Sequence, residues 1–338
     1  MDLKTVISDS GRTGKYPTVI TDEVFTVSFF NEAAKKLIPD ITSGHRLDEY
    51  VTIYDKNELK RSKYPSSTVL GCRDRKYFSV FCPVISGFFK ECVFSIAVPD
   101  ENGNEDCEQY LSMKLAVMSK CLTGATVGVP AGKERAYSRL YSSYEANMRM
   151  LAAMSGNDRS SAVNIKELLD DALSYYCALK YGDEQSKRFT VNTNCDYIRM
   201  KKAVCIILVC IYDICQALSR NGFCNISVDD SVNDGSISFC FSVMPKHKLG
   251  SVLDAADGAE DAIYTLLGHG AENMFIIKTL VRQICGQADI KYDKESDELR
   301  FSVAIPYETK STVKSGKDQF VNVARIAAQM CCAVKGKA

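Results

Sequence analysis

The sequence is poor in the residues that build metal sites. It has three histidines, and none of its 15 cysteines stands in a C-x-x-C pair. Structural zinc sites take closely spaced cysteines, often together with histidine, so we expect no zinc site. The odd number of cysteines also argues against a disulfide framework. We therefore expect reduced thiols that serve as small apolar core residues.

Long apolar runs and a net charge are also missing. Lysine plus arginine and aspartate plus glutamate both number 42, which gives no electrostatic reason to expect nucleic acid or an anionic membrane as a partner. The longest apolar run, 203–212, is about half of the ~20 residues that cross a bilayer. Residues 1–12 contain no apolar signal region. These absences predict a soluble cytoplasmic protein without a membrane span.

What the sequence does have is enough apolar residues for several folded domains. Its 338 residues are 46% hydrophobic and 25% charged, which is typical of a globular chain with two or three domains. Changes in pattern and two polar linkers, 102–106 and 156–161, divide the chain into four parts. They are 1–103, 104–157, 158–307 and 308–338.

Residues 158–307 carry alternating helix and strand patterns. The predicted order is helix, strand, helix, strand, strand, an irregular stretch over 244–267, helix, strand and strand. The two strands before the irregular stretch are predicted at 225–229 and 236–243. The helix over 200–218 is apolar on nearly every face, so we expect it to be deeply buried. Gly268 and Gly270 precede the last helix, and Gly286 closes it. This order resembles the ATP-binding domain of sensor histidine kinases, an α/β sandwich of the Bergerat type.

The first part, 1–103, has a strand, a turn, a strand and a helix that begins Asn-x-Ala-Ala at Asn31. Alternating apolar residues in 76–83 and 87–98 predict two antiparallel strands near its end. This resembles a PAS sensor domain, which implies a small-molecule ligand. A small antiparallel α+β domain of another kind is the alternative.

Residues 104–157 carry two helical seams separated by the loop 128–133. Apolar residues step by four and three at Leu111, Leu115, Met118, Leu122 and Ala125, and again at Tyr137, Tyr141, Tyr144, Met148 and Leu151. Two such helices cannot bury both seams alone, whereas two copies make a four-helix bundle. The pattern resembles the dimerisation and phosphotransfer hairpin of histidine kinases. It implies a homodimer, with a response regulator or another signalling protein as partner.

The hairpin lacks the catalytic residue that the resemblance implies, a nucleophilic histidine on the first helix. Lys120 stands at that position, and none of the three histidines lies in 106–157. A lysine near its ordinary pKa is protonated and cannot attack a phosphate. We therefore predict no phosphohistidine and name no catalytic residue.

The nucleotide site is also altered relative to the family. Asp213 stands where the resemblance implies an asparagine that holds Mg²⁺ and phosphate, and an aspartate is itself able to bind Mg²⁺. Glu272 and Asn273 replace a Leu-Gly pair at the start of the last helix, where a carboxylate should repel phosphate. The remnant of the ATP and Mg²⁺ site would consist of Asp213, Gly268, Gly270 and Asn273.

The aspartate that reads adenine in the family is missing after the strand that ends at Val243. Asp254 or Asp257 in the irregular stretch would be the substitute. ATP and Mg²⁺ are therefore expected as cofactors only if this altered site is still competent. We expect weak or absent ATP binding.

The sequence thus predicts an α+β, multidomain protein that acts as a sensory or regulatory homodimer without kinase activity. An active histidine kinase or ATPase with unusual site residues is one alternative, and a pure protein-interaction module is another. The tail, 308–338, contains an amphipathic helix that packs on its own chain or binds a partner.

Overall fold

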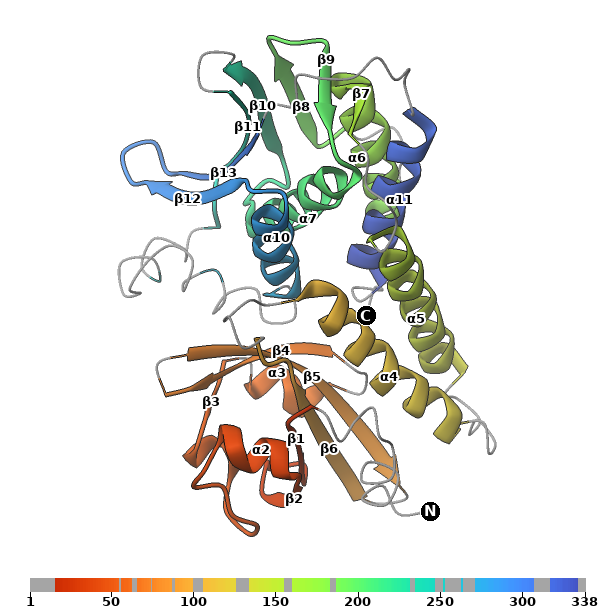
Figure 1. Ribbon diagram of the computed structural model, residues 1–338, viewed down its shortest axis with the longest axis vertical. Coiled ribbons are helices and arrows are strands. Elements are labelled where there is room, and N and C mark those ends of the chain that lie inside the picture. Colours follow the sequence, from red (N-terminus) through yellow and green to blue (C-terminus); the bar gives the residue numbers. More distant parts are fainter. Residues whose placement is uncertain are drawn as a thin grey trace. The chain divides into compact units, whose positions relative to one another are not determined.

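The computed structural model describes residues 16–54, 56–62, 66–73, 75–86, 89–99, 106–125, 134–154, 160–182, 187–231, 235–246, 252, 263, 271–306 and 317–333. They belong to two compact units. The first unit comprises Met1–Met148 with Gly268–Glu272, and the second comprises Arg149–Leu267 with Asn273–Ala338. Both combine helices with largely antiparallel sheets (Figure 1), which confirms the α+β class.

The first unit contains a six-stranded antiparallel sheet in the order β2-β1-β6-β5-β4-β3. Its elements are β1 (Thr18–Thr21), β2 (Val27–Phe30), α2 (Glu32–Leu37), the 3₁₀ helix η1 (Leu47–Glu49), β3 (Thr52–Ile53), α3 (Lys56–Arg61), β4 (Ser66–Cys72), β5 (Arg75–Ser86), β6 (Phe89–Ile96), α4 (Cys107–Ala125) and α5 (Glu134–Met154). The last residues of α5 belong to the second unit.

Asn31 fixes the corner at which α2 begins. Its Oδ1 accepts hydrogen bonds from the backbone N–H groups of Ala34, at 2.9 Å, and Thr18, at 3.0 Å. Its side-chain amide donates to the carbonyl of Tyr16 at 2.8 Å. An asparagine at this position satisfies an N–H group that the first helical turn leaves without an intrahelical partner. The predicted start of this helix at Asn31 is therefore confirmed.

Helix α4 packs along β5 of the same unit. The Tyr110 hydroxyl donates to Ser67 Oγ at 2.6 Å, and its ring meets that of Phe78 edge-on, with centroids 6.4 Å apart. The predicted seam residues whose side chains are described are all buried in α4: Leu111, Leu115, Met118 and Leu122. On α5, by contrast, Tyr141 is 49% exposed and Met148 is 45% exposed. A single chain thus covers the seam of α4 and leaves part of the α5 seam open.

The second unit contains a five-stranded sheet in the order β12-β13-β11-β10-β8, in which only β8 and β10 pair in parallel, and a two-stranded sheet of β7 and β9. Its elements are β7 (Ser161–Asn164), α6 (Ile165–Tyr181), β8 (Phe189–Thr193), β9 (Tyr197–Met200), α7 (Lys202–Leu218), β10 (Cys224–Ser231), β11 (Ser236–Val243), α10 (Ala271–Gln283), β12 (Gln287–Asp293), β13 (Glu298–Pro306) and α11 (Lys317–Ala333). Strands β7 and β9 were not predicted. The placement of Ser161 in a polar linker was wrong, because this residue begins β7.

Helix α7 lies at the centre of the second unit. Every residue from Val204 to Gln216 is buried, which confirms the expected deep burial. One side of α7 packs on β10 and β11, and α6 packs on β8. Helix α11 then packs on both α6 and α7, and Figure 1 shows it running beside α6. Of the two outcomes predicted for the tail helix, packing on its own chain is the one observed.

The end of α10 differs in detail from the expectation. The residue in the left-handed region is Cys285, with φ 57, and Gly286 lies one residue later. A Cβ on Gly286 would lie 2.7 Å from the carbonyl oxygen of Ala304 in β13. Glycine is therefore required here by the close approach of β13, and the reason predicted from helix-capping preference was wrong.

Across the described ranges, no helix combines the length and the apolar character that crossing a bilayer requires.

Candidate functional site

The carboxylate of Asp213 is the polar centre of the second unit. It projects from the apolar helix α7 and is 1% exposed. Its Oδ1 accepts hydrogen bonds from the Tyr176 hydroxyl and from Lys180 Nζ, the latter at 3.3 Å. Its Oδ2 accepts from Asn273 Nδ2 at 2.7 Å. A buried carboxylate is stable only when it is paired and hydrogen-bonded, and these four residues, the Asp213 network, meet that requirement.

Tyr176 and Lys180 reach Asp213 together because they lie four residues apart on α6, on one face of the helix. Lys180 Nζ also donates to the Tyr176 hydroxyl and lies 4.9 Å from the centroid of its ring. Burial, followed by the charge of Asp213, raises the pKa of Tyr176 well above its ordinary value. The phenol therefore keeps its proton and acts as a donor to the carboxylate.

Asn273 links the network to the last helix. Its amide NH₂ group donates to Asp213, while its amide oxygen accepts from the Cys331 thiol of α11, with sulfur and oxygen 3.8 Å apart. Both Asn273 and Cys331 are buried. Together with Cys331, the Asp213 network therefore joins α6, α7, α10 and α11 through side chains alone.

The structure brings together two of the predicted nucleotide-site residues, Asp213 and Asn273. Gly268 and Gly270 lie outside the described residues, and so do the proposed adenine substitutes, Asp254 and Asp257. Lys120 lies within α4, the helix on which the resemblance implies a histidine.

Glu272 does not carry the uncompensated charge that the sequence suggested. In the first unit, its two carboxylate oxygens accept from Lys114 Nζ at 2.6 and 2.7 Å. The side chain of Glu272 is 8% exposed, and that of Lys114 is 2% exposed. The buried ammonium compensates the carboxylate, so Glu272 no longer supplies the predicted repulsion of phosphate.

Sequence reasoning identified neither Lys180 nor Tyr176 as a partner of Asp213. The sequence nevertheless contains an indication of these two partners. A single aspartate in a helix that is apolar on nearly every face needs a buried partner. A tyrosine and a lysine four residues apart on the preceding helix offer both a proton donor and a positive charge.

The Asp213 network does not fit a Mg²⁺ ion. Mg²⁺ takes near-octahedral oxygen ligands and usually keeps several waters, whereas this carboxylate is buried and already accepts three hydrogen bonds. The ammonium of Lys180 would also repel a second cation at this distance. In the part of the chain that the structure describes, no group of three or more His, Cys, Asp and Glu residues could hold a metal ion.

No protein-family model and no curated protein matches this sequence significantly. Several solved structures are similar to the chain. Histidine kinase ThkA, crystallised with the response regulator TrrA, is 10% identical, with a TM-score of 0.35 over 90% of this chain and 98% of that one. Histidine kinase AdeS of Acinetobacter baumannii is 12% identical, with a TM-score of 0.40 over 59% of this chain and 98% of its own.

A third similar structure is the blue-light-activated histidine kinase of Erythrobacter litoralis. It is 12% identical, with a TM-score of 0.31 over 87% of this chain and 96% of that one. All three TM-scores lie below 0.5, so no residue correspondence and no activity is transferred from these proteins.

Proposed function

We propose that this chain is a signalling protein of histidine-kinase-like architecture that acts as a regulatory homodimer and transfers no phosphate. The observation that carries the proposal is the Asp213 network, which is complete without nucleotide or Mg²⁺. Lys180 supplies the positive charge, and Tyr176 and Asn273 supply the remaining hydrogen bonds. Lys120 at the expected phosphoacceptor position supports the same conclusion.

The first unit is the sensory part in this proposal. Strands β1 and β2, helix α2 and the antiparallel strands β5 and β6 follow the order on which the PAS resemblance rests. A small-molecule ligand of this unit stays a prediction. A response regulator or another signalling protein as partner, and the cytoplasm as compartment, are likewise predictions from the resemblance.

Titration of the protein with ATP in a calorimeter, with and without Mg²⁺, tests the absence of a nucleotide site. We expect no saturable heat up to about 1 mM ATP, which corresponds to a binding free energy no stronger than about −4 kcal/mol. The reason is that Lys180 and Asn273 already occupy the Asp213 carboxylate. Micromolar binding that disappears in Asp213→Ala or Asp257→Ala would restore the active-kinase alternative.

Sedimentation velocity tests the dimer. At micromolar protein concentration, the double variant Tyr141→Glu, Met148→Glu is expected to be monomeric where the wild type is a homodimer. Two carboxylates from each chain would otherwise have to be buried at the interface. Both side chains are exposed in the single chain, so the substitutions leave its own core intact. Ser142→Glu, also exposed on α5, serves as the matched control and should stay dimeric.

Leu115 is unsuitable for this test, although its place in the predicted seam suggests it. It is buried within the chain, so a charge there would destabilise the first unit and not report on assembly. A wild-type protein that is already monomeric at micromolar concentration would contradict the proposed dimer.

A further inference from the structure

The ring of Tyr181, the last residue of α6, lies against two cations. The guanidinium carbon of Arg188 lies 3.9 Å from the ring centroid, and Lys180 Nζ lies 5.7 Å from it. The Tyr181 hydroxyl donates to Gln216 Oε1 at 2.9 Å, which holds the ring in place. A cation near an aromatic face is attracted by the ring quadrupole, so positive charge gathers here. Lys180, Tyr181 and Arg188 together form the Tyr181 site.

The guanidinium of Arg188 has no acceptor in the part of the chain that the structure describes. Its Nε is buried and makes no hydrogen bond there. No described carboxylate pairs with Arg188, whereas its sequence neighbour Lys187 pairs with Asp170 at 3.2 Å. A buried donor without an acceptor costs free energy, and the cost is larger when the group is charged. Arg188 therefore needs an acceptor that a ligand is able to supply.

The backbone, together with the ring, restrains this guanidinium. Gly222 lies beside it in the left-handed region, with φ 68. A Cβ on Gly222 would lie 2.9 Å from Arg188 Nη1, so a side chain at this position would displace the guanidinium. The Arg188 side chain is half-buried, which leaves part of it accessible to solvent. A restrained guanidinium loses less conformational entropy on binding than a mobile surface arginine does.

The described charges at the Tyr181 site do not cancel. Lys180 and Arg188 are both cations, and the carboxylate that pairs with Lys180 is that of Asp213. Asp213 is 1% exposed and already accepts hydrogen bonds from Tyr176, Lys180 and Asn273. One positive charge is therefore left over at the ring. The planar fork of an arginine matches a carboxylate or a phosphate, each of which accepts two parallel hydrogen bonds.

We propose that the Tyr181 site binds a single oxyanion, the carboxylate or the phosphate group of a small-molecule effector. The Arg188 guanidinium donates to two oxygens of this group, and Lys180 adds the second positive charge. Because Lys180 also donates to Asp213, the bound anion and the Asp213 network share one cation. This binding site goes beyond the proposed function and does not depend on it.

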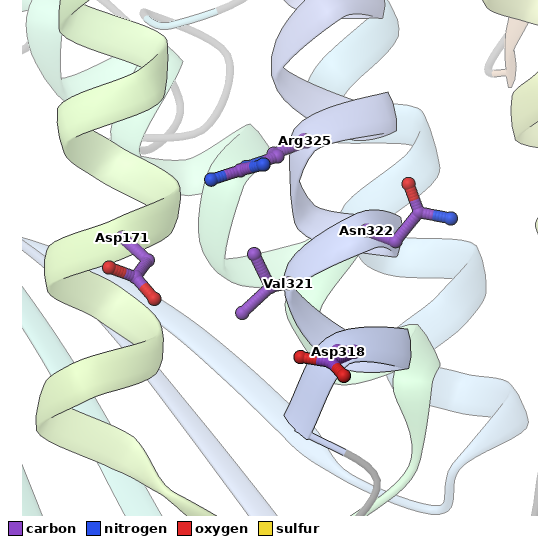
Figure 2. A pocket seen from close by; sticks show the side chains of 5 residues that line it. All are labelled: Asp171, Asp318, Val321, Asn322 and Arg325. Atoms are coloured by element: carbon purple, nitrogen blue, oxygen red, sulfur yellow. The ribbon is translucent and has the colours of Figure 1, made fainter.

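A second arginine of the same unit provides the comparison. The Arg325 guanidinium lies 5.2 Å from the centroid of the Tyr175 ring, so it too is placed beside a tyrosine. Arg325 lines a depression together with Asp171 of α6 and Asp318 of α11, and Figure 2 shows both carboxylates at this depression. These two negative charges oppose the binding of an anion, so no oxyanion is expected at Arg325.

Titration of the ¹⁵N-labelled full-length protein with sodium phosphate, at constant ionic strength, tests the proposal. The backbone amide signals of Tyr181 and Gly222 report on the site in the NMR spectrum. We expect them to shift saturably with a midpoint at about 5–20 mM, because inorganic phosphate offers the oxyanion and no further contact. A response that stays linear and matches the response to sodium chloride would overturn the proposal.

Variants of Arg188 provide the second readout. Arg188→Gln should raise the midpoint at least tenfold, because the charge-assisted hydrogen bonds are lost. Arg188→Lys keeps the charge without the planar fork and should give an intermediate midpoint. Unchanged amide signals of β13 verify that each variant is folded. Arg325→Gln is the matched control and should leave the midpoint as it is, whereas equal midpoints for the wild type and Arg188→Gln would overturn the proposal.

Sodium acetate in place of phosphate identifies the kind of oxyanion. A saturable, Arg188-dependent shift with phosphate alone assigns the site to a phosphate group, and one with acetate alone assigns it to a carboxylate. Equal responses to both support an oxyanion site of either kind. The two proposals fail separately: micromolar Mg²⁺–ATP binding that disappears in Asp213→Ala would remove the proposed function, while a linear phosphate response would leave the calorimetric result unaffected.

Discussion

Replacement of Lys114 by methionine is expected to lower the free energy of unfolding by about 3–5 kcal/mol, because it leaves a buried carboxylate without its positively charged partner. Lys114 Nζ donates to both carboxylate oxygens of Glu272, and both side chains are nearly inaccessible to solvent. The variant leaves the carboxylate buried without its cation. Urea unfolding followed by circular dichroism measures the loss.

The double variant Lys114→Met, Glu272→Leu distinguishes the loss of the buried ion pair from the loss of side-chain packing. Removal of both buried charges in favour of apolar side chains is often close to neutral, so most of the stability should return. A single variant that loses less than about 1 kcal/mol would contradict the argument, since exposed ion pairs are the ones that contribute so little.

Stability is expected to fall steeply above pH 10 because three buried tyrosines must keep their protons in the folded state. They are Tyr110, Tyr176 and Tyr212, and burial is the first cause that raises the pKa of each. In the unfolded chain a tyrosine loses its proton near pH 10. The stabilisation is therefore complete below about pH 10 and is lost as the pH rises toward the folded-state values.

Above pH 10, the free energy of unfolding is expected to fall by about 1.4 kcal/mol per pH unit for each tyrosine. The three together give a slope of about 4 kcal/mol per pH unit. Urea unfolding under reducing conditions at several values between pH 8 and 11 measures it. Tyr110→Phe should remove about a third of the slope, with the exposed Tyr141→Phe as the control for loss of a tyrosine. Equal stability at pH 10 and pH 11 would show that these phenols ionise in the folded protein.

Much of the second unit could be predicted because its elements carry strong local patterns. Strand β11 was predicted with the bounds that it has, Ser236–Val243, since its apolar residues alternate without interruption. Helix α7 was predicted to within two residues because its length and apolar character leave no other interpretation. Strands β7 and β9 have four residues each, which is too short for a period of two to stand out.

The partners of the buried charges could not be predicted in the same way. The position of Asp213 followed from its place in a resembling motif. Its partner Lys180 is 33 residues away, and Lys114 and Glu272 are 158 residues apart. Which side chains meet at such separations depends on how helices pack against one another, and local periodicity carries no record of that packing.

The late position of α11 in the chain affects how the second unit is made on the ribosome. Helix α7 ends at Leu218, and the helix that covers its outer side begins at Lys317, so about 100 residues are synthesised in between. At about 5–20 residues per second, this interval lasts roughly 5–20 s. Throughout it, one face of an almost wholly apolar helix is open to chaperones and to other nascent chains. The yield of folded protein is therefore governed by events during synthesis as well as by the stability of the finished chain.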